Sequence, residues 1–110
     1  MATPRTEAQA QEKLVAYAKA RGWRIAHFRK VLVARKDGTK YWATPVAVDG
    51  NGFPDLCCVR ERVVWVEMKK RKGRWYQEQR DWRAALEAAG QEYHAVYEDV
   101  TASELAAIFG

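Results

Sequence analysis

Cysteine is scarce and long hydrophobic runs are absent in this chain of 110 residues. The only cysteines, Cys57 and Cys58, are adjacent, and neighbouring side chains on a strand rarely form a disulfide. Two thiols without spaced partners also make no zinc site. No apolar run approaches the roughly 20 residues that a membrane-spanning helix needs. The N-terminal segment MATPRTEAQAQEK has no apolar stretch, so we expect no secretory signal and a reduced, cytoplasmic setting.

The composition suits one globular domain with a concentrated positive charge. Hydrophobic residues make up 48% of the chain and aromatic residues 12%, which excludes a disordered protein. The length leaves no room for a second core, so we expect a single domain over residues 1–110. The net charge is +5, and the basic segment KKRKGR at residues 69–74 is followed directly by Trp75 and Tyr76. A solvated turn is the alternative, but this arrangement favours a polyanion as partner.

Hydrophobic spacing and turn residues predict an α/β fold with a central mixed β-sheet flanked by helices, in the order α-β-β-β-α-β-α. Asp37-Gly38 marks a turn, and Tyr41-Trp42 leads into a second strand or an extended loop. The other expected elements are a helix capped at Thr3-Pro4 or Thr6 and ending near Arg21, one or two strands over residues 23–33, a hairpin of residues 56–59 and 63–68, a helix over residues 76–89, a strand over residues 92–98, and a last helix capped at Thr101.

The first expected helix carries a carboxylate on its apolar side. Leu14, Val15 and Ala18 form the apolar stripe, and at about 100° per residue Glu7 continues that stripe towards the N-terminus. Glu12 points towards solvent instead. A carboxylate that continues a core stripe is a candidate site residue. The alternative for Glu7 is a favourable charge at a frayed helix start.

In the second long helix, an amide side chain extends the apolar stripe. Its expected buried stripe consists of Trp82, Ala85, Leu86 and Ala89. Gln79 stands one turn before this stripe and extends it at the N-terminal end, as Glu7 does in the first helix. We therefore count Gln79 among the candidate site residues.

The segment GFPDLCCVRERVVWVEMK, residues 52–69, contains the principal polar residues. On its second strand Glu67 and Lys69 share one face, because strand side chains alternate. A two-residue turn of Glu61 and Arg62 would place Asp55 on the opposite face. For Asp55 to join Glu67 and Lys69, the connection must have three residues or a bulge, or Asp55 must precede the regular pairing. We also expect the glycines just before Asp55 to let the backbone approach a ligand or a metal.

Two carboxylates on neighbouring strands repel each other unless a positive group lies between them. All-oxygen ligands favour Mg²⁺ or Mn²⁺ over zinc, and the carbonyl of Met68 would complete the set formed by Asp55 and Glu67. We expect Lys69 to hold a water or a phosphate oxygen, Glu7 to reach a second ion, and Gln79 to orient a phosphate or the attacking water. The alternative for Glu67 and Lys69 is an exposed ion pair on a strand face.

The motifs GFPDL, VVWVEMK, KG, QRDW and AAG, in this order, resemble the VRR-NUC domain of the PD-(D/E)xK nuclease superfamily, in particular its small stand-alone members from phages and bacteria. The resemblance extends from TEAQAQEKLVAYAKARGW to the last strand. By position, the superfamily's two acidic metal ligands match Asp55 and Glu67, its lysine matches Lys69, and the family's helical glutamine matches Gln79. Its first-helix glutamate matches Glu7.

This resemblance implies a restriction-endonuclease-like fold and Mg²⁺- or Mn²⁺-dependent cleavage of DNA. Stand-alone members resemble Holliday junction resolvases, which implies branched DNA as substrate and a homodimer. Trp42 or Trp75 would then serve an interface or stack on bases, with core packing as the alternative. The residues expected to contact DNA are Lys70, Arg71, Lys72, Arg74 and Trp75.

Two other functions fit the same residues. The first is a less selective nickase or single-strand nuclease that uses the same chemistry. The second is a DNA-binding module that does not cut, although such a module has no need for Asp55, Glu67 and Lys69 together. His27 is interpreted as a strand histidine satisfied by its neighbours, with a metal or phosphate contact as the alternative.

Overall fold

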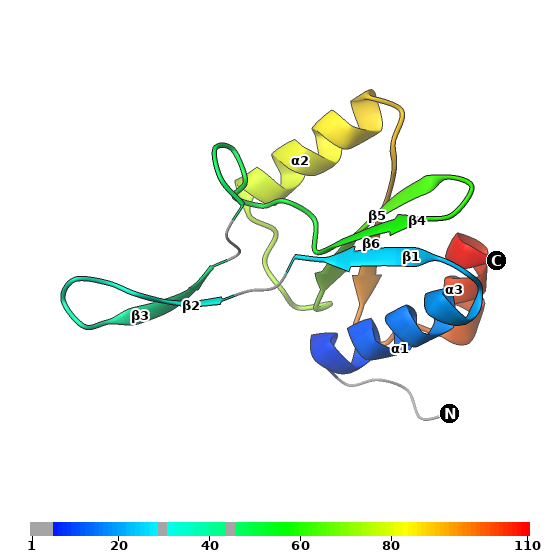
Figure 1. Ribbon diagram of the computed structural model, residues 1–110, viewed down its shortest axis with the longest axis horizontal. Coiled ribbons are helices and arrows are strands. Elements are labelled where there is room, and N and C mark those ends of the chain that lie inside the picture. Colours follow the sequence, from blue (N-terminus) through cyan, green and yellow to red (C-terminus); the bar gives the residue numbers. More distant parts are fainter. Residues whose placement is uncertain (1–5, 29–30, 44–45) are drawn as a thin grey trace.

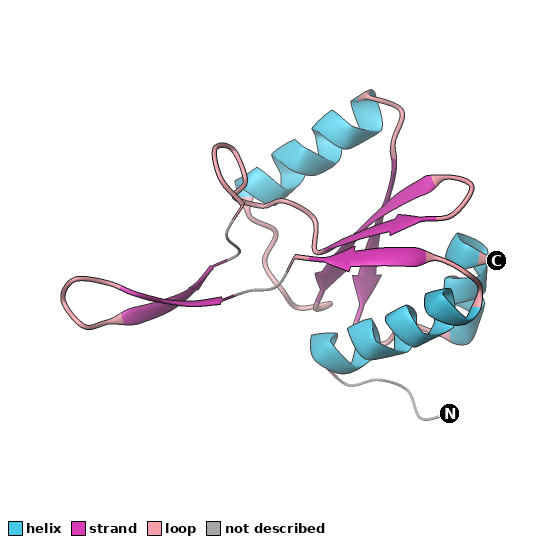
Figure 2. Ribbon diagram, in the orientation of Figure 1, coloured by secondary structure: helices cyan, strands magenta, loops and turns pink. Residues whose placement is uncertain are grey.

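The computed structural model describes residues 6–28, 31–43 and 46–110, which form a mixed α/β structure (Figures 1 and 2). None of the helices in this described part is both long and apolar enough to cross a membrane. The elements in chain order are α1 (Glu7–Ala20), β1 (Arg24–His27), β2 (Val31–Ala34), β3 (Lys40–Ala43), β4 (Leu56–Val59), β5 (Val63–Lys69), α2 (Gln77–Ala88), β6 (Glu92–Tyr97) and α3 (Ala102–Phe109).

Helix α1 begins and ends where its capping residues predict. The Thr6 hydroxyl accepts a hydrogen bond from the Gln9 backbone amide at 3.1 Å, which satisfies one of the free amides of the first turn. The other expected cap, at residues 3–4, lies outside the described residues. Leu14 and Ala18 are buried and Glu12 is exposed, as predicted.

The central sheet is mixed, as expected, with the strand order β1-β4-β5-β6. The pairs β1–β4 and β4–β5 are antiparallel, and β5–β6 is parallel. Val64, Val66 and Met68 of β5 join the core with α1 and α3, whereas α2 lies on the other face (Figure 1). The predicted alternation of β5 is therefore confirmed, and Glu67 and Lys69 point away from the core, towards α2.

The predicted order of three strands before the second helix is wrong, because the described residues contain five. Strands β2 and β3 form a separate two-stranded sheet that projects from the body of the molecule (Figure 1). The predicted turn at Asp37-Gly38 joins them, and Asp37 Oδ1 accepts from the Thr39 amide at 2.9 Å. The two strands pair with each other rather than with the central sheet, and Leu32 and Trp42, which face each other, remain exposed.

The predicted buried stripe of α2 is also wrong, since no residue of this helix is buried. Ala85 is exposed, and Trp82 is only half-buried. At Trp82 the loop before β4 lies between the helix and the sheet. The Phe53 ring contacts the Trp82 ring edge-on at 4.9 Å and the Trp65 ring at 5.4 Å, and Trp82 donates to the Asp49 carbonyl at 2.8 Å. Ala89 and Leu86, at the far end of the helix, are exposed and half-buried respectively.

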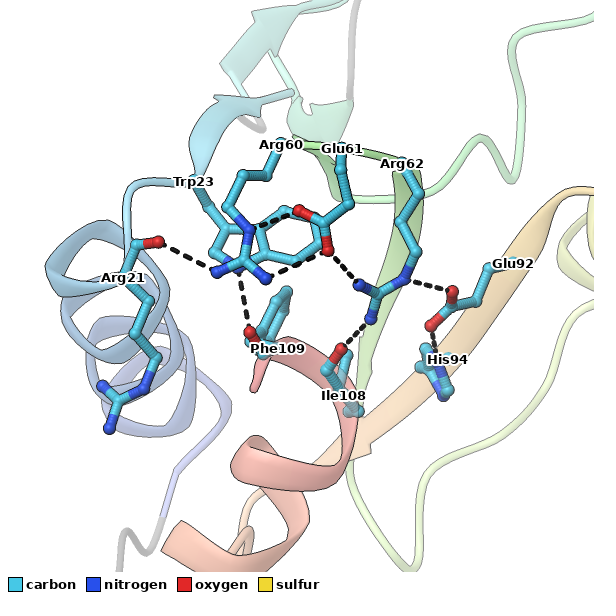
Figure 3. Close-up of polar contacts among 9 residues, drawn as sticks. All are labelled: Arg21, Trp23, Arg60, Glu61, Arg62, Glu92, His94, Ile108 and Phe109. Atoms are coloured by element: carbon cyan, nitrogen blue, oxygen red, sulfur yellow. Dashed lines mark hydrogen bonds and ion pairs between the residues drawn. The ribbon is translucent and has the colours of Figure 1, made fainter.

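The three-residue turn between β4 and β5 is tied to the end of α3 (Figure 3). The guanidinium groups of Arg60 and Arg62 lie 4.8 Å and 5.0 Å from the ring of Trp23. Trp23 donates to the Phe109 carbonyl at 3.1 Å. Glu61 accepts hydrogen bonds from both arginines, so this end of the two strands is held firmly. The same network includes Ile108, Glu92 and His94.

Candidate active site

Asp55 lies beside Glu67 because the turn at the other end of β4 and β5 has three residues. Val59 pairs with Val63 and Leu56 with Val66, so Asp55 directly precedes the pairing and stands next to Glu67. The Met68 backbone amide donates to Asp55 Oδ2 at 2.8 Å, which orients the carboxylate. Of the three alternatives that the sequence left open, the three-residue connection is observed. Asp55 also precedes regular pairing, the other route that would bring it to this face.

Glu67 and Lys69 form a buried hydrogen-bonded chain with Gln79. Only 4% of Glu67 and 6% of Lys69 is exposed to solvent. The Gln79 amide nitrogen donates to Glu67 Oε1 at 2.9 Å, and Gln79 Oε1 accepts from Lys69 Nζ at 3.1 Å. The Arg74 carbonyl accepts from Lys69 at 2.6 Å. Buried charges require such partners, so the alternative of an exposed ion pair does not hold.

The position of Gln79 depends on Gly52. Gly52 has φ +79°, and a Cβ atom there would lie 2.4 Å from the Glu78 carbonyl carbon and 2.6 Å from the Gln79 nitrogen. A side chain at this position would therefore push the first turn of α2 away from the loop. Gln79 Oε1 also accepts from the Tyr76 amide at 3.0 Å and caps the helix. We expected the backbone at these glycines to approach a ligand or a metal, and at Gly52 it approaches the first turn of α2.

One cavity of about 520 Å³ brings the sequence-predicted site residues together. They come from α1, from the loop before β4, from β5 and from α2, which are far apart in the chain. The aromatic residues at this cavity were not predicted as a group, although Trp42 was among the residues expected to stack on bases. The residues in the cavity wall that matter here are Glu7, Asp55, Glu67, Met68, Lys69, Gln79, Arg74, Tyr41, Trp42 and Tyr76.

The donors that would hold a metal ion are the carboxylates of Asp55 and Glu67 and the Met68 carbonyl. Hard oxygen donors in one polar cavity suit Mg²⁺ or Mn²⁺. Within the described residues, no three His, Cys, Asp or Glu side chains gather into a metal-binding group. Glu7 lines the same cavity, and its assignment to a second ion stays a prediction.

Sequence reasoning missed Tyr93, which lies behind the carboxylates. Its hydroxyl is buried and makes no hydrogen bond within the described residues. Burial raises the pKa of Tyr93, and the negative charges of Glu67 and Asp55 raise it further. The positive charge of Arg83 acts in the opposite direction and lowers this pKa. No local pattern in the sequence places a tyrosine of β6 next to β5.

Apart from the buried Lys69, the residues of the basic segment are exposed, but the charge of Arg71 is already paired. Arg71 Nε lies 3.2 Å from Asp99 Oδ1, and its guanidinium lies 4.2 Å from the ring of Tyr97. Lys70 and Lys72 are exposed, and Arg74 reaches the wall of the cavity. The predicted DNA contacts of these residues stay predictions.

Three other candidate residues, two tryptophans and a histidine, differ in their exposure and contacts. Trp75 is half-buried with Lys69 Nζ 4.9 Å from its ring, whereas Trp42 is mostly exposed. His27 is exposed on β1, and its ring nitrogens lie 3.2 Å and 3.3 Å from the Gln11 amide nitrogen. This contact agrees with a strand histidine satisfied by a neighbour. Both cysteines are free, as expected.

Comparison of the chain with protein-family models, with curated proteins and with solved structures gives no significant match.

Proposed function

We propose that this protein is a metal-dependent endonuclease that hydrolyses phosphodiester bonds in DNA, with a restriction-endonuclease-like fold of the VRR-NUC type. One observation carries the proposal: the buried chain Glu67–Gln79–Lys69 lines the same cavity as Asp55. The two carboxylates supply the negative charge that would bind a metal ion, and the lysine supplies a positive charge for the phosphate.

Asp55, Glu67 and the Met68 carbonyl would hold Mg²⁺ or Mn²⁺. When bound, such an ion lowers the pKa of a coordinated water and stabilises negative charge on the phosphate oxygens. Lys69 would hold the scissile phosphate or the attacking water, because its ammonium is fixed in the cavity by the Gln79 and Arg74 oxygens. Gln79 keeps Glu67 and Lys69 at a constant separation through the two ends of one amide group.

The basic segment would bind the phosphate backbone beside this cavity, since Arg74 belongs to both. Branched DNA as the preferred substrate, a homodimer as the active species and a cytoplasmic setting belong to the same proposal.

Cleavage of a four-way junction, a flap, a single strand and a plain duplex, each with Mg²⁺, Mn²⁺ or a chelator, tests the function. We expect cutting only with the ion, and at least a hundredfold slower cutting by Lys69→Ala and Asp55→Asn, since each removes a charge from the site. Lys19→Ala, an exposed lysine of α1, is the control and should cut normally. Sedimentation of the same samples gives the solution mass.

Undiminished cutting in chelator would contradict the proposal. DNA binding without cutting, unaffected by Mg²⁺ and without thermal stabilisation by the ion, would instead favour the non-catalytic DNA-binding module. Equal cutting of all four substrates would favour the less selective nuclease.

A further inference from the structure

The mouth of the cavity carries exposed aromatic rings. Trp42 is 67% exposed and Tyr76 is 55% exposed, and both line the cavity that contains the carboxylates. Tyr41, next to Trp42 on β3, lines it as well. Exposed aromatic side chains that gather in one place mark an interaction site, and here they come from two separate parts of the chain that meet at one cavity.

Trp42 is the ring that remains open for stacking. The Arg35 guanidinium lies 4.2 Å from the Tyr41 ring, and the Arg74 guanidinium lies 5.4 Å from the Tyr76 ring. In the described part of the chain, no ring or cationic group stacks on Trp42. An uncovered indole beside a polar cavity can receive a flat partner on its face.

The hairpin that carries Trp42 is basic at its turn. Arg35, Lys36 and Lys40 are exposed, and the one carboxylate, Asp37, is engaged by the Thr39 amide and hydroxyl. Positive side chains next to an exposed indole suit a strand that offers phosphates and flat bases in alternation. An aliphatic peptide or a second apolar hairpin would leave these charges without partners.

We propose that the β2–β3 hairpin binds unpaired nucleotides of a DNA strand, with a base stacked on Trp42 and the phosphates held by the basic turn. The inference rests on the proposed function in one respect, since it places the next phosphate of that strand in the cavity. Duplex DNA keeps its bases stacked inside the helix, so this surface selects strands with unpaired bases.

Binding in the presence of a chelator tests this surface without any cleavage. The ligands are a 12-nucleotide single strand, the same strand with abasic sites in place of the central bases, and the blunt duplex. We expect Trp42→Ala to weaken binding of the intact strand by about 5- to 100-fold, the usual effect of losing one stacked base. Its affinity for the abasic strand and the duplex should stay within about twofold of wild type, because the phosphates remain.

Leu32→Ala is the matched control. Leu32 lies opposite Trp42 on the same face of the hairpin and is 50% exposed, but it does not line the cavity. It should change none of the three affinities by more than about twofold, since an aliphatic side chain offers no stacking face. Trp42→Tyr should recover most of the binding of the intact strand because it keeps an aromatic ring.

An equal loss for all three ligands would mean that Trp42 only supports the hairpin, and it would overturn the proposal. A change of sedimentation mass in Trp42→Ala with unchanged DNA binding would do the same and identify a second copy of the chain as the partner. Loss of binding confined to the intact strand would support the stacking surface even if no substrate is ever cut. The two proposals therefore fail separately.

Discussion

Gln79 is the residue on which the arrangement of charges depends. Its amide nitrogen donates a hydrogen bond to Glu67, and its oxygen accepts hydrogen bonds from Lys69 and from the Tyr76 backbone amide. Asparagine, the only other side-chain amide, also pairs a donor with an acceptor but is one carbon shorter. A glutamate here would present an acceptor to Glu67 and repel it.

We therefore predict that Gln79→Ala lowers the free energy of unfolding by about 1–3 kcal/mol, because it removes a hydrogen-bond partner from two buried charges. Gln77→Ala is the control. Gln77 lies on the same helix and makes a surface contact with Asp81, which contributes at most about 0.5 kcal/mol. Urea unfolding of both variants measures the two changes in the free energy of unfolding. Equal changes would show that the chain Glu67–Gln79–Lys69 contributes nothing to stability.

Gly52 controls the same site through its backbone. Gly52→Ala and Gly22→Ala both force alanine into a positive φ, +79° and +84°, so they share that conformational cost. Only at Gly52 does the added methyl group meet backbone, whereas at Gly22 nothing lies within 4 Å. We predict that Gly52→Ala destabilises the protein by about 1–3 kcal/mol more than Gly22→Ala, the usual cost of overpacking. Similar unfolding midpoints for the two variants would mean that the loop moves aside freely.

At the level of elements, the turn between β4 and β5 has a pH-dependent ion pair. The hydrogen bond from Arg60 lowers the pKa of Glu61 from its ordinary value of 4.5 to about 2. A carboxylate with a lowered pKa stabilises the fold above its unfolded pKa, and this contribution is lost as the pH falls through the folded value.

The prediction is that wild type is more stable than Glu61→Gln at neutral pH, and that the difference disappears between pH 4.5 and about 2. Thermal unfolding across this range measures it. Glu12→Gln, which changes an exposed carboxylate of α1, supplies the control for general effects of charge. A difference that does not vary with pH would mean that Glu61 acts through packing rather than through its charge.

Local signals in the sequence predicted most of these elements and the carboxylates of the site. Thr6 and Thr101 indicate helix starts because their hydroxyl groups accept hydrogen bonds from free backbone amides of the first turn. Because strand side chains alternate, the number of residues between Asp55 and Glu67 limited the connection to three residues, a bulge, or an Asp55 that precedes regular pairing, and the first and last of these are observed. These features depend on neighbours within a few residues, which a single sequence displays.

Features that depend on distant neighbours were not predictable. The spacing of Trp82 and Ala85 indicates an apolar side of a helix, but it does not reveal that Phe53 and its loop lie between that helix and the sheet. Leu32 and Trp42 have the pattern of a sheet strand, but pairing with each other leaves them exposed. In both cases the sequence shows which residues share an apolar face. Whether that face is buried depends on which distant segment packs against it.

At the scale of the whole molecule, two groups of positive side chains, the basic segment and the turn of the β2–β3 hairpin, belong to parts of the chain that meet at the cavity. The basic segment reaches it through Arg74, and the hairpin reaches it through Trp42. A net charge of +5 distributed in this way would attract a polyanion towards the opening from both sides. Within the basic segment, however, Arg71 is paired with Asp99, while Lys72 is exposed.

This difference predicts unequal salt dependence of DNA binding. Log affinity falls with log salt, and each phosphate contact adds about 0.9 to the magnitude of this negative slope for duplex DNA, because a counterion is released. Lys72→Ala should lower the slope by about that amount. Arg71→Ala should lower it much less, because Arg71 is held by Asp99, makes no phosphate contact and so releases no cation from the DNA. Equal reductions in titrations without divalent ions would show instead that DNA draws Arg71 away from Asp99, which would leave that carboxylate facing the phosphates at a cost in affinity.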